Sequence, residues 1–223
     1  NDEPDRQGMT EIRHVEGLYA MWEDLMRRHP GLVVDICASG GRRIDFETLR
    51  YGLPLWHSDM QCFGPKPAAD QLQNGGLFLW LPLHGCGNFE LEPSYVFRSA
   101  MTSGNILIAG MGKPVMTDPN VVEGVKRSVA VYKKIRPLML GDFYPLFPHA
   151  DAENAWYGYQ FHRPDLNAGF ALVFRRQDAA DSTAELKLRE LSPSSTYEVT
   201  FQEQPGSETV TGERLGAFPV EIA

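Results

Sequence analysis

Apolar and polar residues alternate along the first 140 positions in blocks that predict helices and strands in turn. A first helix is expected over residues 11–28, because its apolar residues recur with the i, i+3, i+4, i+7 spacing of one buried helix face. Those residues are Leu18, Met21, Trp22 and Leu25. Pro30 and Gly31 end this helix, since proline cannot continue the helical hydrogen bonds and glycine tolerates the turn. The apolar run that follows, residues 32–36, predicts a strand buried on both faces.

The same order of elements repeats along the chain. Further short strands are expected at residues 54–59, 77–83 and 105–110, and helices over 45–50, 68–74, 93–102 and 119–136. The Gly75-Gly76 pair is expected to end its helix, whereas Asp118 followed by Pro119 is a typical helix start. Such alternation indicates a parallel sheet with crossover helices. Four strands make half of an eight-stranded barrel, or a small doubly wound sheet.

After Gly141 the pattern changes to the period of two that is typical of half-buried antiparallel strands. Strands are expected at residues 156–162, 170–174, 184–189 and 197–201. Turn-forming residues such as those at 193–195 and 205–207 separate them. The sequence therefore predicts two domains, 1–140 and 141–223, of which the second is a small antiparallel β-domain.

Composition narrows the classes of function. Of the 223 residues, 43% are hydrophobic and 22% are charged, which is enough apolar mass for a core. The net charge of −8 argues against a nucleic-acid partner, because phosphate binding needs a basic surface. No apolar run approaches the roughly 18 residues of a membrane helix, so no membrane association is expected. The polar N-terminus lacks a start methionine and a signal peptide, and we interpret it as a cut inside a longer protein.

Neither the cysteines nor the histidines predict a metal or redox centre. The odd number of cysteines excludes a complete set of internal disulfides, and there is no CxxC pair. A Cys62–Cys86 bridge is an alternative, but free thiols are favoured. No histidine spacing supports a metal site, and the Gly110–Lys113 segment lacks the phosphate-loop pattern. We therefore expect no cofactor and no metal.

Two predicted strand ends carry polar side chains that are suited to chemistry. The first is the segment 35–45, which contains Cys37, and the second is 56–59, which ends in Asp59. Active sites of barrel enzymes lie at the C-terminal ends of the strands. Cys37 and Asp59 are one βα unit apart, so adjacent strand ends are expected to place both on one wall of a pocket.

The order C-x-S-G-G-x-R-x-D, read in segment 35–45, followed by W-x-S-D resembles glycoside hydrolase family 36. That family contains α-galactosidases (melibiases), α-N-acetylgalactosaminidases and the plant raffinose and stachyose synthases. The resemblance covers residues 10–140, and the β-domain by position and type only. It implies an α/β fold, namely the C-terminal half (strands five to eight) of a (β/α)8 TIM barrel, followed by a small antiparallel β-sandwich domain.

The resemblance also implies roles for individual residues. Asp59 matches the general acid/base, and Trp56 matches an aromatic residue at the sugar subsite. A wall that holds the sugar hydroxyls corresponds to Cys37, Ser39, Gly40 and Gly41. Supporting positions behind these contacts correspond to Asp35, Arg43 and Asp45. Two departures from the family pattern, Arg42 in place of a third glycine and Cys62 in place of a second acid, leave the sugar specificity open.

A retaining glycosidase needs two carboxyl groups about 5–5.5 Å apart. The family's nucleophile lies on the strand before the helix 11–28, so the resemblance implies that this chain holds the acid/base without the nucleophile and is inactive alone. The longer protein would remove terminal α-galactosyl residues from an oligosaccharide or glycoconjugate. Half a barrel has open sheet edges, so a homo-oligomer is a possible partner state. The compartment is unknown.

Other readings of the same residues remain open. A raffinose-synthase-like α-galactosyl transferase would use the same site with a sugar acceptor in place of water. A non-catalytic carbohydrate-binding or interaction module would keep the fold and lack the catalytic activity. A complete small α/β domain of unrelated function is the remaining alternative. Taken singly, Asp59 is an ordinary turn acid, whereas Trp56 and Cys37 are ordinary core residues.

Overall fold

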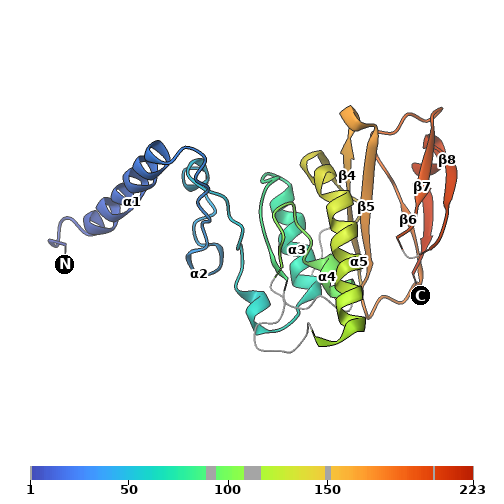
Figure 1. The fold of residues 1–223 in the computed structure, drawn as a ribbon, viewed down its shortest axis with the longest axis horizontal. Helices are drawn as coiled ribbons and strands as arrows, with labels where there is room; N and C mark the ends of the chain where they lie inside the picture. The colour runs from blue at the N-terminus through green and yellow to red at the C-terminus, as the bar shows by residue number, and fades with distance from the viewer. Residues whose placement is uncertain (1, 89–93, 108–116, 149–151, 203, 223) are drawn as a thin grey trace.

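The computed structural model describes residues 2–88, 94–107, 117–148, 152–202 and 204–222. Figure 1 shows an elongated molecule in which the first helix stands apart at one end, further helices form a middle layer, and antiparallel sheets occupy the other end. Within these described ranges, no helix is long and apolar enough to cross a membrane.

The helices agree well with the sequence prediction. They are α1 (Met9–Arg28), α3 (Pro67–Phe78), α4 (Ser94–Ser99) and α5 (Pro119–Ile135). The predicted start of α5 is confirmed, because the Asp118 side chain accepts a hydrogen bond from the Asn120 amide. Shorter helical turns are α2 (Ala38–Gly41), α6 (Gly212–Leu215), and the 3₁₀ turns η1 (Thr48–Arg50), η2 (Met60–Phe63), η4 (Arg136–Leu140) and η5 (Pro164–Leu166).

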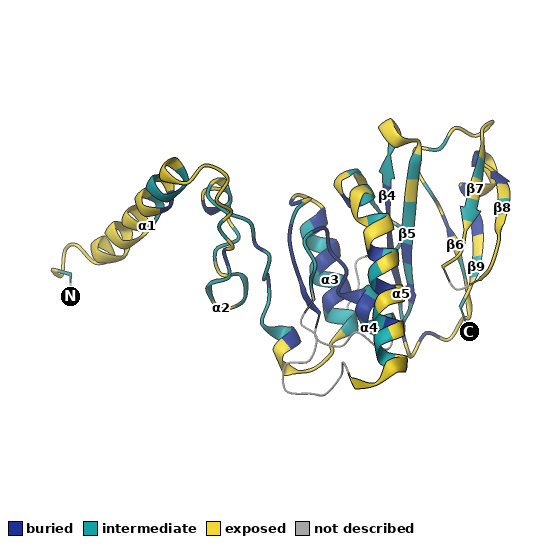
Figure 2. Ribbon diagram, in the orientation of Figure 1, coloured by how far each residue is buried: buried dark blue, intermediate teal, exposed yellow. Residues whose placement is uncertain are grey.

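Two details of the helices differ from expectation. The Gly75-Gly76 pair does not end α3, which continues to Phe78. A Cβ at Gly75 would overlap the Tyr157 hydroxyl, so glycine allows this helix to pack closely on a strand of the C-terminal part. The apolar stripe of α1 is also less buried than predicted. Only Trp22 is buried on this helix, which is exposed over most of its length (Figure 2).

The described strands of the first part are short. Among the described residues of this part, only β1 (Gly87–Asn88) and β2 (Ile106–Leu107) form a parallel pair, and Asp35 makes a single parallel bridge to Leu53. The second half of the strand expected at 105–110 lies outside the described residues. The regular strand expected at 32–36 is wrong: Val33 is 64% exposed, because this segment has a described neighbour on one side only.

The strand expected at 77–83 is also wrong, since its first two residues complete α3. No regular strand forms over 54–59. Backbone hydrogen bonds nevertheless connect the four segments side by side in chain order. Ile36 N donates to Leu53 O (3.0 Å), Gly85 N to Pro54 O (2.8 Å), and Ile106 N to Cys86 O (3.1 Å). The first part is therefore a set of short parallel segments with helices between them.

The C-terminal part is antiparallel, as predicted. One sheet has the order β3-β4-β5, and two further pairs are β6 with β9 and β7 with β8. The bounds are β3 (Asp142–Pro145), β4 (Trp156–Arg163), β5 (Ala168–Arg175), β6 (Thr183–Leu186), β7 (Thr196–Thr200), β8 (Ser207–Thr211) and β9 (Phe218–Glu221). All four predicted strands are present, whereas β3, β8 and β9 were not predicted.

The main apolar core lies between the middle helices and the sheet β3-β4-β5. Phe78 of α3 packs edge-on against Phe161 of β4, with ring centroids 4.8 Å apart, and both side chains are buried. Phe97 of α4 and Tyr159 of β4 belong to the same cluster. A smaller cluster joins the remaining strands through Leu186, Val210, Leu215 and Phe218. The main core therefore takes residues from both sides of position 140.

Buried ionisable groups lie close to this core. Asp70 of α3 is 2% exposed, and its Oδ1 accepts a hydrogen bond from Gln61 Nε2 (2.6 Å). Burial raises the pKa of Asp70 from 3.8 to about 6. His84 is fully buried against Phe78, and burial lowers its pKa from 6.5 to about 3. The carboxyl and the imidazole are therefore both held toward their neutral forms.

These two groups make opposite contributions to the pH dependence of stability. Between pH 3.8 and 6 the folded chain keeps a proton on Asp70 that the unfolded chain has lost, so this group lowers stability as pH rises. Below pH 6.5 the unfolded chain binds a proton at His84 that the folded chain does not, so this group raises stability as pH rises. If the Asp70 carboxyl is removed, the rise in stability with pH that His84 causes should therefore no longer be opposed.

We expect the variant Asp70→Asn to gain more stability than the wild type when the pH is raised from 4.5 to 6.5. The difference in unfolding free energy should be about 2 kcal/mol, from the shift of roughly two pKa units. Urea unfolding at both pH values measures it. The variant of the exposed Asp178, Asp178→Asn, is the matched control and should keep the wild-type slope. Equal slopes for Asp70→Asn and wild type would contradict the prediction.

Candidate active site

Segments 35–45 and 56–59, which carry the candidate catalytic and binding residues, are neighbours in space. Asp35 is the first residue of segment 35–45, and its Oδ1 accepts a hydrogen bond from the amide of Leu55 (3.1 Å), the residue just before segment 56–59. The Ile36 amide donates to Leu53 O in the same region. The backbone thus carries residues 37–41 and 56–59 out of adjacent parallel segments, as the spacing of the two motifs predicts.

The first segment forms a left-handed turn. Four consecutive residues of α2 have positive φ angles: Ala38 (50°), Ser39 (54°), Gly40 (75°) and Gly41 (87°). The Gly41 amide closes the turn by donating to Cys37 O (2.8 Å). Left-handed geometry costs roughly 1–2 kcal/mol for each residue that has a Cβ. Such local strain is typical of functional loops that their surroundings hold in place.

Close packing against the second segment holds this turn in place. A Cβ at Gly40 would lie 2.7 Å from the Asp59 amide nitrogen and 3.1 Å from its carboxyl carbon. A Cβ at Gly41 would overlap the carbonyl oxygen of His57. Both positions therefore need glycine for two reasons, the positive φ and the lack of space. The turn lies directly beside Asp59.

The carboxylate of Asp59 is oriented by Trp56. The indole Nε1–H donates to Asp59 Oδ1 (2.8 Å), and both side chains are half-buried. The indole ring is itself packed against β1, because a Cβ at Gly87 would overlap it. The structure thus brings together the glycine turn, the aromatic ring and the carboxylate that sequence analysis singled out.

Two residues that position this group were not predicted. His57 is buried, and its Nδ1 is hydrogen-bonded to the carbonyl oxygen of Gly85 on the next segment. Burial lowers the pKa of His57, which favours the neutral imidazole, and the hydrogen bond to Gly85 braces the backbone between Trp56 and Asp59. Gly87 makes room for the Trp56 ring. His57 lies within the second motif and Gly87 outside both motifs, and the role of each depends on a neighbour that is distant in sequence.

The other expected supporting residues point to their own loop or to α1. Arg43 places its guanidinium 5.9 Å from the centroid of the Trp22 ring. Asp45 accepts hydrogen bonds from the Thr48 amide (2.9 Å) and from the Thr48 hydroxyl (2.8 Å). The hydrogen bond from the amide is the main reason that the pKa of Asp45 is lowered. These contacts anchor the far end of the glycine turn rather than reach Asp59.

Cysteine chemistry and metal binding receive no support from the described residues. Cys37, Cys62 and Cys86 are free thiols, so the favoured reading over a Cys62–Cys86 bridge is confirmed. Burial raises the pKa of Cys86, which keeps that thiol neutral. In the part of the chain that the structure describes, no three His, Cys, Asp or Glu side chains are grouped as a metal site. The Gly110–Lys113 segment lies outside the described residues.

Comparison with known proteins adds to this geometry. The Melibiase family model matches residues 1–63, a range that contains both motifs. The chain is 28% identical to α-galactosidase 1 of Pediococcus pentosaceus over 207 residues, covering 87% of this chain and 27% of the relative. It is also 28% identical to α-galactosidase AgaA of Geobacillus stearothermophilus over 211 residues, covering 88% and 27%. The chain thus spans about a quarter of the length of these curated relatives.

Solved structures agree at the level of fold. The AgaA variant crystallised with stachyose has a TM-score of 0.78 at 23% identity, covering 100% of this chain and 31% of that one. The α-galactosidase from Lactobacillus brevis has a TM-score of 0.77 at 20% identity, covering 100% and 30%. The resemblance read from the two motifs is confirmed: the chain is similar to part of several α-galactosidases, one of which is described as a member of glycoside hydrolase family 36.

Proposed function

We propose that the chain is part of a retaining glycoside hydrolase that removes terminal α-galactosyl residues, with Asp59 as its general acid/base. The observation that carries this proposal is the Trp56 Nε1 to Asp59 Oδ1 hydrogen bond beside the turn at Gly40. It orients a half-buried carboxyl group next to backbone amides that can approach a sugar closely. The curated relatives named as α-galactosidases support the substrate class.

Asp59 would act twice in the reaction. It first protonates the glycosidic oxygen of the departing group, and it later removes a proton from the water that releases the sugar. Both steps need a carboxyl group that is accessible yet held in one orientation. The indole of Trp56 supplies the orientation, and the half-buried position of Asp59 leaves one side open.

The sugar would lie against the left-handed turn. The wall of this subsite would consist of Cys37, Ser39, Gly40 and Gly41, and the absence of Cβ atoms at the two glycines lets this wall pack directly beside Asp59. Trp56 would offer an aromatic face at the same subsite. Asp35, Arg43 and Asp45 would hold the turn without contacting the sugar. No cofactor or metal takes part in this scheme.

The nucleophile would come from protein outside these residues. The family resemblance implies a nucleophile on a strand before α1, and the described residues 2–8 contain no strand. Residues 1–140 would then be strands five to eight of a (β/α)8 barrel, and residues 141–223 a β-sandwich domain. The parallel hydrogen bonds among the four segments support the barrel. Exposed apolar side chains such as Phe46 and Phe63 support a further covering layer.

The proposal is tested by replacing the matching quarter of Geobacillus AgaA with this chain. We expect the hybrid to hydrolyse an aryl α-galactoside, whereas the 223-residue chain alone does not turn it over. A folded hybrid without activity, shown by a cooperative melt and a native-like spectrum, would contradict the enzymatic role. Activity of the chain alone that is lost in Asp59→Asn would show that it carries its own nucleophile. Product analysis with added sucrose separates hydrolysis from galactosyl transfer.

A further inference from the structure

The candidate acid/base lies at the start of the short turn η2, so the place of this turn decides the place of its carboxyl group. Asp59 directly precedes η2, and its carbonyl oxygen accepts a hydrogen bond from the Cys62 amide (3.0 Å). The Met60 amide donates to the Ser58 hydroxyl (3.1 Å). These bonds join Asp59 to η2, so a movement of the turn also moves the backbone of Asp59.

Helix α3 holds η2 through two side-chain contacts. Gln61 of η2 donates from its Nε2 to Oδ1 of Asp70, which lies in the first turn of α3 (2.6 Å). Both side chains are buried, with 6% and 2% of their surface exposed. A weaker contact runs from Gln73 Nε2 of α3 to Met60 Sδ (4.0 Å). The turn that carries Asp59 is therefore fixed to a helix of the main core.

A buried carboxyl group is a costly means of packing a turn against a helix. Burial raises the pKa of Asp70 to about 6, because the charged form is poorly solvated at this position. The neighbouring Cys86 and Tyr159 are both held neutral by burial, so neither offers a positive charge to Asp70. Apolar side chains would fill such a space at lower cost. What the carboxyl group adds is a directional bond that fixes η2 in one position.

We propose that Asp70 is a positioning residue that holds the carboxyl group of Asp59 in place through Gln61 and η2. On its other side, Asp59 meets the Trp56 indole and the turn at Gly40. A Cβ at Gly40 would lie only 2.7 Å from the Asp59 amide nitrogen, so the fit allows little movement of η2. The inference rests on the proposed role of Asp59, but the orientation of that residue can be measured without catalysis.

The test follows the Trp56 indole N–H of the full chain by NMR, with its resonance assigned from Trp56→Phe. Asp70→Ala removes the acceptor of the Gln61 amide. We expect the resonance to shift toward its position in Asp59→Ala, and the indole proton to exchange with solvent about tenfold faster, the effect of weakening one hydrogen bond. Asp70→Asn keeps an acceptor oxygen for Gln61, so it should retain the wild-type resonance and exchange rate.

A second variant breaks the same bond from the other side. Gln61→Leu should shift the Trp56 resonance as Asp70→Ala does, and the double variant should add nothing further, because the two substitutions remove one interaction. If Asp70→Ala does not fold, Gln61→Leu decides the question alone. An unchanged resonance in a folded Gln61→Leu, or a shift in Asp70→Asn as large as that in Asp70→Ala, would overturn the proposal.

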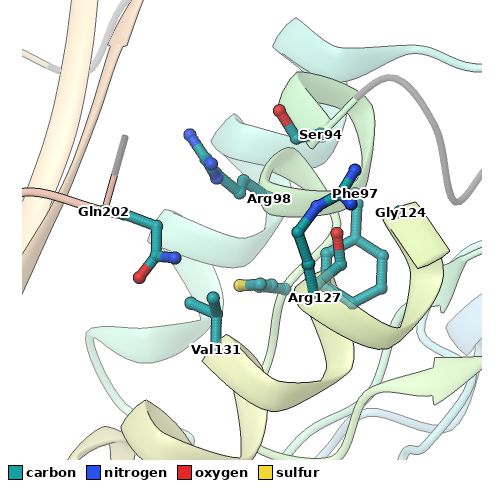
Figure 3. Close-up of a pocket in the computed structure, with 9 residues that line it drawn as sticks. Ser94, Phe97, Arg98, Gly124, Arg127, Val131 and Gln202 are labelled. Atoms are coloured by element: carbon teal, nitrogen blue, oxygen red, sulfur yellow. The ribbon is translucent and has the colours of Figure 1, made fainter. Parts of the chain in front are cut away.

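Two controls separate positioning from a general loss of stability. Gln160→Leu removes a buried glutamine that bonds the backbone of Arg189, so it should destabilise the chain and leave the Trp56 resonance unchanged. Val131→Ala removes apolar volume from a hollow between α4 and α5 (Figure 3), which none of the candidate-site residues lines, and should also leave it unchanged. Shifts in these controls as large as that in Gln61→Leu would overturn the proposal.

Kinetics of the AgaA hybrid distinguish failure of this inference from failure of the proposed function. Asp70→Ala should lower kcat for raffinose by about tenfold to a hundredfold, the usual effect of a misplaced catalytic group, with little change in KM. Asp70→Asn should restore most of the lost activity. A shifted Trp56 resonance with an unchanged kcat would support the positioning of Asp59 by Asp70 and contradict the catalytic role of Asp59.

Discussion

Replacement of Asp59 by asparagine is expected to lower the kcat of the AgaA hybrid for raffinose by about 10²–10⁴-fold, the usual contribution of general acid–base catalysis. The amide keeps the shape of the carboxyl group and can still contact the Trp56 indole, but it cannot give up a proton. The loss should therefore fall on the chemical step, and KM should change little.

The leaving group distinguishes an acid/base from a residue that only maintains structure. The dinitrophenolate group of a dinitrophenyl galactoside departs without protonation. In the step that cleaves the glycosidic bond, Asp59→Asn should therefore lose far less activity with this substrate than with raffinose. The variant of the exposed Asp142, Asp142→Asn, should behave like wild type with both substrates. If Asp59→Asn lowers both rates equally, Asp59 is not the acid.

Substitution of Gly41 by alanine is expected to lower the unfolding free energy of the chain by about 2–5 kcal/mol, the sum of left-handed strain and overpacking. The φ angle of Gly41 is 87°, and the new Cβ would meet the carbonyl group of His57, whose carbon lies 2.9 Å away. His57 cannot retreat, because its imidazole is buried and bound to Gly85 O.

A matched glycine separates the two causes. Gly31 has a φ of 92°, and nothing lies within 4 Å of a Cβ built there. Gly31→Ala therefore carries the backbone strain without the overlap, and should lose about 1–2 kcal/mol in chemical denaturation. Equal losses in the two variants would show that the contact between the glycine turn and His57 is absent in solution.

The sequence predicts elements well where the signals are local. The bounds of α1 and α5 follow from apolar spacing, from Pro30 and from the Asp118 cap, all of which act within one or two turns. The residues at 77–83 were misread, because a short apolar run is compatible with either a helix end or a buried strand. The segment 32–36 failed because a strand needs a partner on each side to be buried.

In the candidate site, too, only the features with a local signal could be predicted from the sequence. The proximity of Cys37 and Asp59 could be predicted, because one βα unit separates adjacent strand ends. The left-handed geometry of the turn could not be predicted, since the residue type of Ser39 gives no signal for a positive φ. The bracing role of His57 depends on a carbonyl 28 residues away, which no local pattern reveals.

The shared core across position 140 limits how this protein could have evolved. Phe78 packs on Phe161 of β4, and Tyr95 of α4 packs on Phe174 of β5. Arg176, which follows β5, donates to the Gln71 side chain of α3 (3.1 Å). A recombination event that exchanged only the β-part would leave these apolar faces and the buried guanidinium without matching surfaces. The two parts are therefore inherited together, and their interface must change by compensating substitutions rather than by the exchange of modules.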